Sequence, residues 1–488
     1  MVATAGPIVN RAAPPRARTA DGRIPILMGA ATVAAALLGA GIAISRDAGF
    51  LLGFVLLAVA TVAVPAGAYV LVALVSALTF KGLVSLGLLP PVAVFLDIPV
   101  VWAALAMALM RRRGWSPEAA RVIRWLGVLG LAVLAAWAFH PTEVVRPFLV
   151  MALLGEPFAL VAALLVDPPS RRLRGALLGT ALALVLVQIP LSYWQAYGAG
   201  VGDAVQGTLL GAGAGAHTMA GVVAVGVIWL LAALPQGASW RLPLVMLLLP
   251  IPLLADAKQG LFALPAIVVA GRGRQGWGMF LLRLGVVGGS LTALILLFPL
   301  GRAALFFIDR TFTEGGGKVR ATEMVVQEIT EDPPSFFFGK GPAQTVSRSA
   351  FMTTDLFLAA DSPLRGFGLE PARIPQEVSA GLPVAGTSFE GGLSSALGVV
   401  GDLGVIGGAA YAGLFLTVIR MTHRVRTPEG FAATAGLAVF GVLGLVYDWW
   451  EQPPFGVFLA VMAGLALTSE RGNQEEETAP PLAVEGHR

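Results

Sequence analysis

Apolar runs about 20 residues long recur along most of this chain, and they constrain its fold more than any other feature. One helix of that length crosses the hydrocarbon core of a bilayer. Hydrophobic residues make up 56% of the chain and charged residues 13%, and so few charges cannot cover the surface of a soluble globule of 488 residues. The sequence therefore predicts an all-α, polytopic membrane helical bundle.

The runs predict about 12 to 14 transmembrane helices. The upper figure counts two runs, 242–254 and 260–270, that are too short to cross a membrane unaided. The full-length spans are expected at 24–44, 49–67, 69–89, 92–110, 122–139, 147–166, 175–196, 213–233, 278–300, 394–419, 431–449 and 454–468. The polar interval 301–392 is then the one long loop of the bundle.

Arginine clusters set the expected orientation of the bundle. The arginines that fall at every second turn, and so can face the cytoplasm together, are Arg111, Arg112, Arg113, Arg171, Arg172, Arg174, Arg272, Arg274, Arg420, Arg424 and Arg426. The short turns on the opposite side carry only Arg46, Arg146 and Lys258. This pattern predicts a multi-pass protein of the cytoplasmic (inner) membrane, with both termini in the cytoplasm and the 301–392 loop outside. The net charge of +4 is thus a topology signal and does not indicate a nucleic-acid partner.

These assignments divide the chain into five parts. We expect a disordered cytoplasmic tail at 1–23, an N-terminal transmembrane bundle at 24–300, the extracytoplasmic loop at 301–392, C-terminal transmembrane helices at 393–468 and a second disordered cytoplasmic tail at 469–488. The chain has no cysteine, which excludes disulfides and thiolate metal sites. Its four histidines all lie outside the loop, so the sequence predicts no metal and no cofactor there.

The first part of the loop has a helical pattern. Within Arg310–Thr330, charged side chains alternate with the apolar ones at positions 319, 324, 325, 326 and 329. This pattern predicts an amphipathic helix that lies against the outer surface. Asp332-Pro-Pro334 is expected to end it.

A short aromatic and glycine-rich segment follows. Phe336–Phe338 leads into Gly339-Lys-Gly341, whose glycines would let backbone amides and Lys340 approach an anion closely. Farther on, Phe351–Pro383 contains prolines, glycines and scattered acidic residues without periodicity. That segment is expected to be irregular.

Ionisable residues within or beside the apolar runs are functional candidates, because a charge inside a membrane is costly. They are Lys81, Asp97, Glu156, Asp256, Lys258 and Asp448. Structural explanations compete: Lys81 can extend its amine to the interface, and Asp97 and Asp448 lie near expected helix ends. Glu156 precedes Pro157, where a helix leaves a backbone group without a partner. Asp256 and Lys258 lie at an outer turn, where they either face the outer compartment or neutralise each other.

Two motifs in the last half of the chain resemble those of a known family. The loop contains Gly339-Lys-Gly341-Pro342, and the segment after it reads Leu393-Ser-Ser-Ala-Leu-Gly-Val-Val-Gly-Asp-Leu-Gly-Val-Ile-Gly407. Together they resemble the bacterial O-antigen ligase and polymerase superfamily, in which a G-x-G turn precedes the motif H-N-x-x-L-x-x-x-x-E-L-G-x-x-G. The matching residues are Leu397, Asp402, Gly404 and Gly407, whereas Leu393 and Ser394 replace the His-Asn of the motif. Two further matches are Ala257-Lys258, where the family commonly has Ser-Arg, and Arg320, where it commonly has an arginine.

The resemblance implies a metal-independent, inverting membrane glycosyltransferase of the GT-C type. Such an enzyme transfers or polymerises a glycan from a polyprenyl-diphosphate-linked donor onto an acceptor hydroxyl at the outer face of the membrane. Lys258 and Arg320 would stabilise the diphosphate that leaves, by analogy with the family's cations. Glu390, the carboxylate nearest to the missing histidine, would be the base, or else it is a solvated loop residue.

The remaining candidates would bind substrate: Lys318, Gly339, Lys340, Gly341, Arg348 and Asp402. The expected partners are the lipid-linked donor, a glycan or lipid acceptor and membrane lipids. Two other functions stay open at this point. One is a transporter or flippase of lipid-linked sugars, and the other is a non-enzymatic membrane-assembly subunit descended from this family, which the loss of His-Asn would allow.

Overall fold

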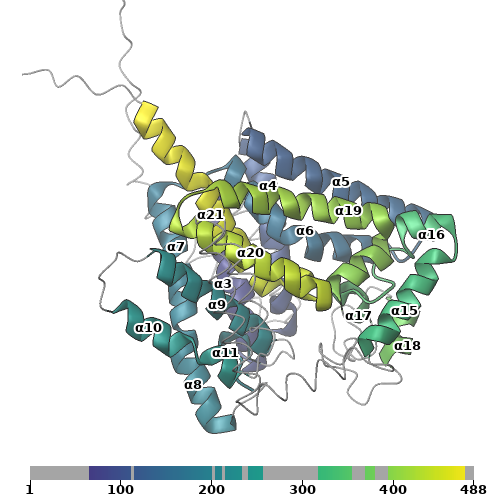
Figure 1. Cartoon of the computed structure of the whole chain (residues 1–488), viewed down its shortest axis with the longest axis horizontal. Helices are drawn as coiled ribbons and strands as arrows, with labels where there is room; N and C mark the ends of the chain where they lie inside the picture. Colours follow the sequence, from purple (N-terminus) through teal and green to yellow (C-terminus); the bar gives the residue numbers. More distant parts are fainter. Residues whose placement is uncertain are drawn as a thin grey trace, which may run out of the picture. The chain divides into compact units, whose positions relative to one another are not determined.

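The computed structural model describes residues 65–111, 115–200, 204–210, 215–233, 240–255, 317–353, 369–379 and 394–478 (Figure 1). Every regular element within these ranges is a helix. The expected spans at 24–44 and 278–300, almost all of 49–67 and the short run 260–270 lie outside the described residues. All the described residues belong to one unit, Val64–Arg488.

Six described helices are long and apolar enough to cross a membrane: Ala66–Ser85, Ala93–Arg111, Pro117–Phe139, Val145–Val166, Arg171–Gly198 and Ser395–Arg424. Shorter apolar helices cover Gly215–Leu230, Glu429–Leu445 and Pro453–Ser469. In element terms these are α3 (Ala66–Ser85), α4 (Asp97–Arg111), α5 (Pro117–Phe139), α6 (Val145–Val166), α7 (Arg171–Leu186), α8 (Gln188–Ala199), α9 (Gly215–Ala233), α19 (Ser395–Arg424), α20 (Pro428–Val446) and α21 (Pro453–Thr478). The all-helical, membrane-type architecture expected from the sequence is therefore present in the described part of the chain.

Prolines explain two of the differences between the helices and the expected spans. The span at 175–196 is the pair α7 and α8, which are separated at Val187. Pro190 has no N–H to donate to the carbonyl one turn earlier, so the ladder is interrupted there. The short run 242–254 is likewise divided, into α10 (Arg241–Leu248) and α11 (Ile251–Leu254).

Helix α21 ends later than expected. It continues to Thr478, ten residues past the expected boundary at 468 and into the segment expected to be a disordered tail. The added turns contain Glu475-Glu-Glu477 and other residues that favour helix. Helical propensity therefore extends this element beyond its apolar part.

Helix α6 is the most enclosed of the six long apolar helices, with 83% of its apolar window buried. It packs against α4, α5 and α21, and α5 in turn packs against α19 (Figure 1). Small residues allow this closeness: a Cβ on Gly456 would lie 2.7 Å from Pro157, and one on Gly155 would lie 2.9 Å from Trp102. The polar residues of α6 consequently face protein and not lipid.

The described part of the loop forms four short helices, α15 (Gly317–Thr330), α16 (Pro333–Phe338), α17 (Arg348–Phe351) and α18 (Arg373–Ser379). Helix α15 ends before Asp332, as expected, and the Asp332 side chain then caps α16 by accepting from the Ser335 N–H at 2.7 Å. The segment expected to be irregular contains α18, whose seven residues are too few to show a periodic pattern.

The amphipathic helix α15 is present, but its apolar face packs against other residues of the loop. The buried side chains are Ala321, Val325 and Ile329, and they form a cluster with Val346, Phe351, Ile374 and Val378. Val326, expected on the apolar face, is 46% exposed. The loop therefore has a small hydrophobic core of its own, to which Leu397 and Val400 of α19 also contribute.

Candidate functional site: the loop docked on the membrane helices

Helix α19 is kinked at Gly404, and the kink receives the glycine-rich turn of the loop. Gly404 has φ 66°, a left-handed conformation that favours glycine. A Cβ there would lie 2.3 Å from the Phe337 backbone, and a Cβ on Gly339, which has φ 75°, would lie 2.3 Å from the Asp402 backbone. The Lys340 N–H donates to the Gly401 carbonyl at 2.8 Å, next to the interruption of the helix. The two motifs that carry the family resemblance are thus in direct contact.

Asp402 fixes the backbone that follows this turn. Its carboxylate accepts hydrogen bonds from the backbone N–H groups of Ala343, Gln344 and Thr345 at 3.1, 3.1 and 2.7 Å. It also accepts from the hydroxyls of Thr345 at 2.7 Å and Ser347 at 2.6 Å. Asp402 is buried, and these five donors occupy both of its oxygens. In this geometry the amides that follow the turn bind the side chain of Asp402, which acts as a positioning residue.

Arg146 holds the same loop from another membrane helix. It is buried at the start of α6 and donates to the carbonyl of Ala343 at 2.6 Å, to Thr353 Oγ1 at 3.3 Å and to the carbonyl of Glu370. Its Nε also pairs with Glu143 at 2.5 Å. The sequence had marked Arg146 only as a lone cation in an outer turn. Its contacts show that this turn and the loop lie at the same end of the bundle, as the distribution of arginines along the sequence predicts.

A second set of charged residues joins α17 to the short connection between α20 and α21. Arg348 pairs with the buried Asp448 at 2.7 Å. Glu451 accepts from the Arg348 N–H at 2.8 Å and from the Ser349 N–H and hydroxyl at 3.2 and 3.0 Å. Burial raises the pKa of Glu451 to about 7, although the hydrogen bond from the Arg348 backbone opposes this shift. We call Lys81, Lys318, Arg348, Asp448 and Glu451 the outer cluster.

Two lysines complete the outer cluster. Lys318 is buried at the start of α15, with its Nζ 5.3 Å from the centre of the Tyr447 ring. Burial lowers the pKa of Lys318 to about 7, and the charge of Asp448 opposes the shift. Lys81, half-buried near the end of α3, interacts electrostatically with Arg348 and Asp448. Cations from α3, α15 and α17 therefore gather around one buried acid.

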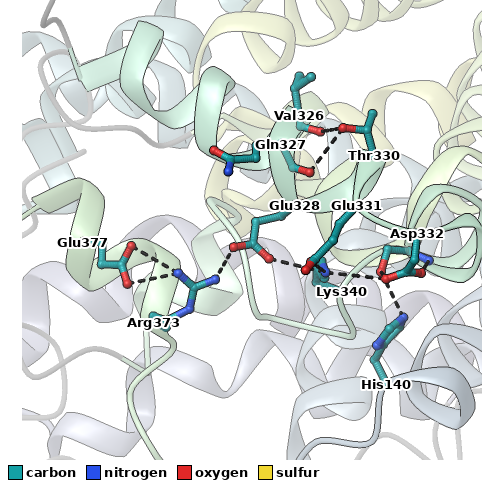
Figure 2. Close-up of polar contacts among 11 residues, drawn as sticks. His140, Val326, Gln327, Glu328, Thr330, Glu331, Asp332, Lys340, Arg373 and Glu377 are labelled. Atoms are coloured by element: carbon teal, nitrogen blue, oxygen red, sulfur yellow. Dashed lines mark hydrogen bonds and ion pairs between the residues drawn. The ribbon is translucent and has the colours of Figure 1, made fainter.

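Lys340, in contrast, lies in an exposed network of ion pairs (Figure 2). Its amine is 2.6 Å from Glu331, 3.4 Å from Glu328 and 3.9 Å from Asp332. Glu328 also pairs with Arg373. Three carboxylates thus balance the charge of Lys340, so the anion that it meets in the described structure comes from the protein.

The other predicted site residues are placed as follows. Arg320 is half-buried on α15 and, two positions after Lys318, points to a different face of the helix. Lys258 and Glu390 lie outside the described residues, so the expected convergence of Lys258 with Arg320 and the assignment of Glu390 as the base stay predictions. Leu393 also lies outside, while Ser394 caps α19 by accepting from the Leu397 N–H at 3.3 Å.

Sequence reasoning missed Glu451 and gave Arg146 and Asp448 no specific role. The available signal was the polar stretch Tyr447-Asp-Trp-Trp-Glu-Gln452 between two apolar runs, since such a turn at the outer side would face the loop. Among the described residues, no group of three or more His, Asp or Glu side chains is arranged to hold a metal ion.

The sequence matches no protein-family model, and no curated protein is detectably similar to it. The docked loop and the outer cluster are therefore the features of this chain from which a function can be inferred.

Proposed function

We propose that the protein is a membrane glycosyltransferase that transfers or polymerises a glycan from a polyprenyl-diphosphate-linked donor. The observation that carries this proposal is the docking of the Gly339–Gly341 turn on the kink of α19 through Asp402 and Gly404. These are the motif residues on which the resemblance to O-antigen ligases and polymerases depends, and their contact gives the shared spacing a structural reason. The same docking brings Lys318 and Arg348, both substrate-binding candidates, to one end of the bundle.

The outer cluster has the chemistry that a diphosphate leaving group needs. Negative charge develops on the diphosphate as the glycosidic bond breaks, and preorganised cations stabilise it. Arg348 supplies a guanidinium, and Lys318 and Lys81 supply amines that are cationic when protonated, against Asp448 and Glu451. In this proposal Arg320 and Lys258 add to the same field from α15 and from the outer turn between the two short runs.

Two carboxylates are candidates for the base that deprotonates the acceptor hydroxyl. Glu390 is the candidate from the sequence. Glu451 is the candidate from the structure, because a carboxyl with a pKa of about 7 is suited to accept a proton near neutral pH. Comparison of Glu390→Gln with Glu451→Gln separates them, since only the variant that lacks the base should lose turnover while retaining donor affinity.

We infer the location of the reaction from the arginine clusters, which are expected on the cytoplasmic side of the bundle. We propose that the loop and the outer cluster face the outside of the cytoplasmic membrane and that both termini are cytoplasmic. A donor carried by a membrane lipid would then reach the cluster from the outer leaflet, with its diphosphate at the level of the helix ends. The acceptor is a glycan or a lipid that carries a free hydroxyl.

The test is glycan transfer by the purified protein in vesicles that contain a polyprenyl-diphosphate-linked oligosaccharide. We expect longer or transferred glycans, and a loss on the order of a hundredfold in rate for Lys318→Met. Lys340→Met is the matched control, because its charge is already balanced by exposed carboxylates, and it should stay close to the wild-type rate. Movement of the donor across the bilayer without transfer would contradict the proposal in favour of a transporter. Absence of both activities would favour a non-enzymatic subunit.

A further inference from the structure

Glu156 is an ionisable side chain buried in the membrane interior without a described partner. It is 0% exposed, and neither carboxylate oxygen has a hydrogen-bond partner among the described residues. It follows the first residue of α6, Val145, by about three helical turns, or roughly 16 Å. That depth is about half of the hydrocarbon thickness. An ionised carboxylate at such a place lacks both water and a counter-charge, so the neutral acid is the favoured form.

The local backbone suits the protonated form of Glu156. Pro157 has no N–H, so the Leu153 carbonyl loses the donor that it would meet in a regular helix. A protonated carboxyl has an O–H to donate, which a carboxylate lacks. The sequence Glu-Pro therefore leaves, about one turn before an acid that can carry a proton, a carbonyl that lacks its helical donor.

Asp97 is the second acid of this region. Helix α6 packs against α3, α4, α5, α17, α21 and the 3-10 turn Trp449–Glu451, and of their described titratable groups Asp97 of α4 is the one that interacts electrostatically with Glu156. The charged side chains on the other neighbours are Lys81 of α3, Arg348 of α17, Glu451 of the turn and, on α5, Glu118, Arg121 and Arg124 near its first residues. Helix α21 has no charged residue before position 470.

The charges of this region balance if Glu156 is protonated. Two buried carboxylates on packed helices disfavour each other's ionisation. With Glu156 neutral, Asp97 is the negative charge of the two acids, and Lys81, which interacts electrostatically with Asp97, compensates it when protonated. Lys81 also interacts with Arg348 and Asp448, so this group is continuous with the outer cluster.

We infer that Glu156 is a proton-binding site within the membrane bundle, in which the buried carboxyl, unpartnered among the described residues, holds a proton and the neighbouring acid Asp97 disfavours its release. This inference does not depend on which reaction the outer cluster performs.

The test uses the full-length protein in lipid nanodiscs and dicyclohexylcarbodiimide, an apolar reagent that adds to protonated carboxyl groups. Mass spectrometry should find the adduct on Glu156 at neutral pH and less of it as the pH is raised. Asp97→Asn should move half-labelling to lower pH, because the like charge that disfavours ionisation of Glu156 is removed. Glu323, exposed on α15, should stay unlabelled at neutral pH and serves as the internal control.

An infrared measurement makes the test independent of reagent access. In heavy water at neutral pD, the wild type should show the carbonyl band of a protonated carboxyl that is missing from Glu156→Gln, a variant that keeps the shape of the neutral acid. Absence of both the adduct and this band would overturn the inference. Protection of Glu156 by sodium ions at constant pH would also overturn it, because the site would then bind a metal cation instead of a proton.

Discussion

Asp402 and Arg146 both hold the backbone of Ala343, one through its N–H and the other through its carbonyl. The Asp402 carboxylate accepts from the Ala343 N–H at 3.1 Å, and the Arg146 guanidinium donates to the Ala343 carbonyl at 2.6 Å. Ala343 has φ 56°, a left-handed conformation that costs a non-glycine residue about 1–2 kcal/mol. We call Asp402, on α19, and Arg146, on α6, the clamp. Because the clamp residues come from two membrane helices, the conformation of the loop depends on the packing of these helices.

The first prediction concerns this clamp. Asp402→Asn replaces a carboxylate that accepts five hydrogen bonds with a neutral amide. The NH2 group of this amide would face N–H and O–H groups that also donate. We expect the loop to be destabilised by about 3 kcal/mol, seen as faster tryptic cleavage at its lysines and arginines and as a lower unfolding temperature. Lys340→Met, which removes an exposed ion pair, should change the stability by less than about 1 kcal/mol.

A double-mutant cycle distinguishes a shared clamp from two independent contacts. If Asp402 and Arg146 act together on the backbone of Ala343, then Arg146→Met should cost less in the Asp402→Asn background than in the wild type. Additive losses from the two substitutions would show that each residue stabilises a different part of the loop.

The second prediction concerns the kink of α19. Gly404→Ala places a methyl group against the Phe337 backbone in a left-handed conformation, so we expect a loss of at least about 1–2 kcal/mol and release of the glycine-rich turn. Gly127→Ala is the control, because that glycine lies within α5 with no neighbour within 4 Å of the added Cβ. Alanine there should leave the unfolding temperature unchanged or raise it slightly. Equal tolerance of both substitutions would contradict the docking geometry.

The membrane helices were predictable because their signal is local. Composition and run length are enough to identify α5, α6 and α19, and the start of α19 at Ser395 is one residue from the expected boundary. The amphipathic pattern also predicted α15, whose C-terminal end is marked by Asp332-Pro-Pro334. The pattern could not predict which residues pack against the apolar face of α15, because Phe351 and Val378 come from other parts of the loop.

The candidate site was less predictable because its contacts join distant segments. Arg146 and Ala343 are 197 residues apart, and Arg348 and Asp448 are 100 residues apart. A single sequence has no local pattern that pairs such residues. The family motif marked Asp402 as special, but its part as an acceptor for the loop backbone became visible only once the path of the turn was known.

The third prediction concerns topology. A cysteine that replaces Ser347 would be a poor probe, since Ser347 is 2% exposed. Gln327, exposed on α15, and Arg426, exposed after α19, are better positions in a chain without native cysteines. We expect an impermeant maleimide to label Gln327→Cys in intact cells, and to label Arg426→Cys only after permeabilisation. The reverse pattern would invert the bundle and exclude an outer-face reaction.

The fourth prediction is the pH dependence of anion binding at the outer cluster. Burial lowers the pKa of Lys318 to about 7, so this amine is charged below that pH and loses its charge as the pH rises. An anion binds the charged form, and its affinity should therefore fall by about tenfold for each pH unit above 7, until the pH reaches the raised pKa of the amine in the complex. Inorganic pyrophosphate is a simple probe for the diphosphate, with binding measured by calorimetry or by the shift of the unfolding temperature.

Lys318→Arg supplies the control that isolates this amine. A guanidinium stays charged throughout the range, whereas the ionisation of pyrophosphate and of Glu451 affects both proteins alike. The ratio of wild-type affinity to Lys318→Arg affinity should thus be constant below pH about 7 and should fall above it. A ratio that stays flat up to pH about 9 would show that Lys318 is not the group that binds the anion, even if pyrophosphate still stabilises the protein. The cationic role would then pass to Arg320 or Lys81.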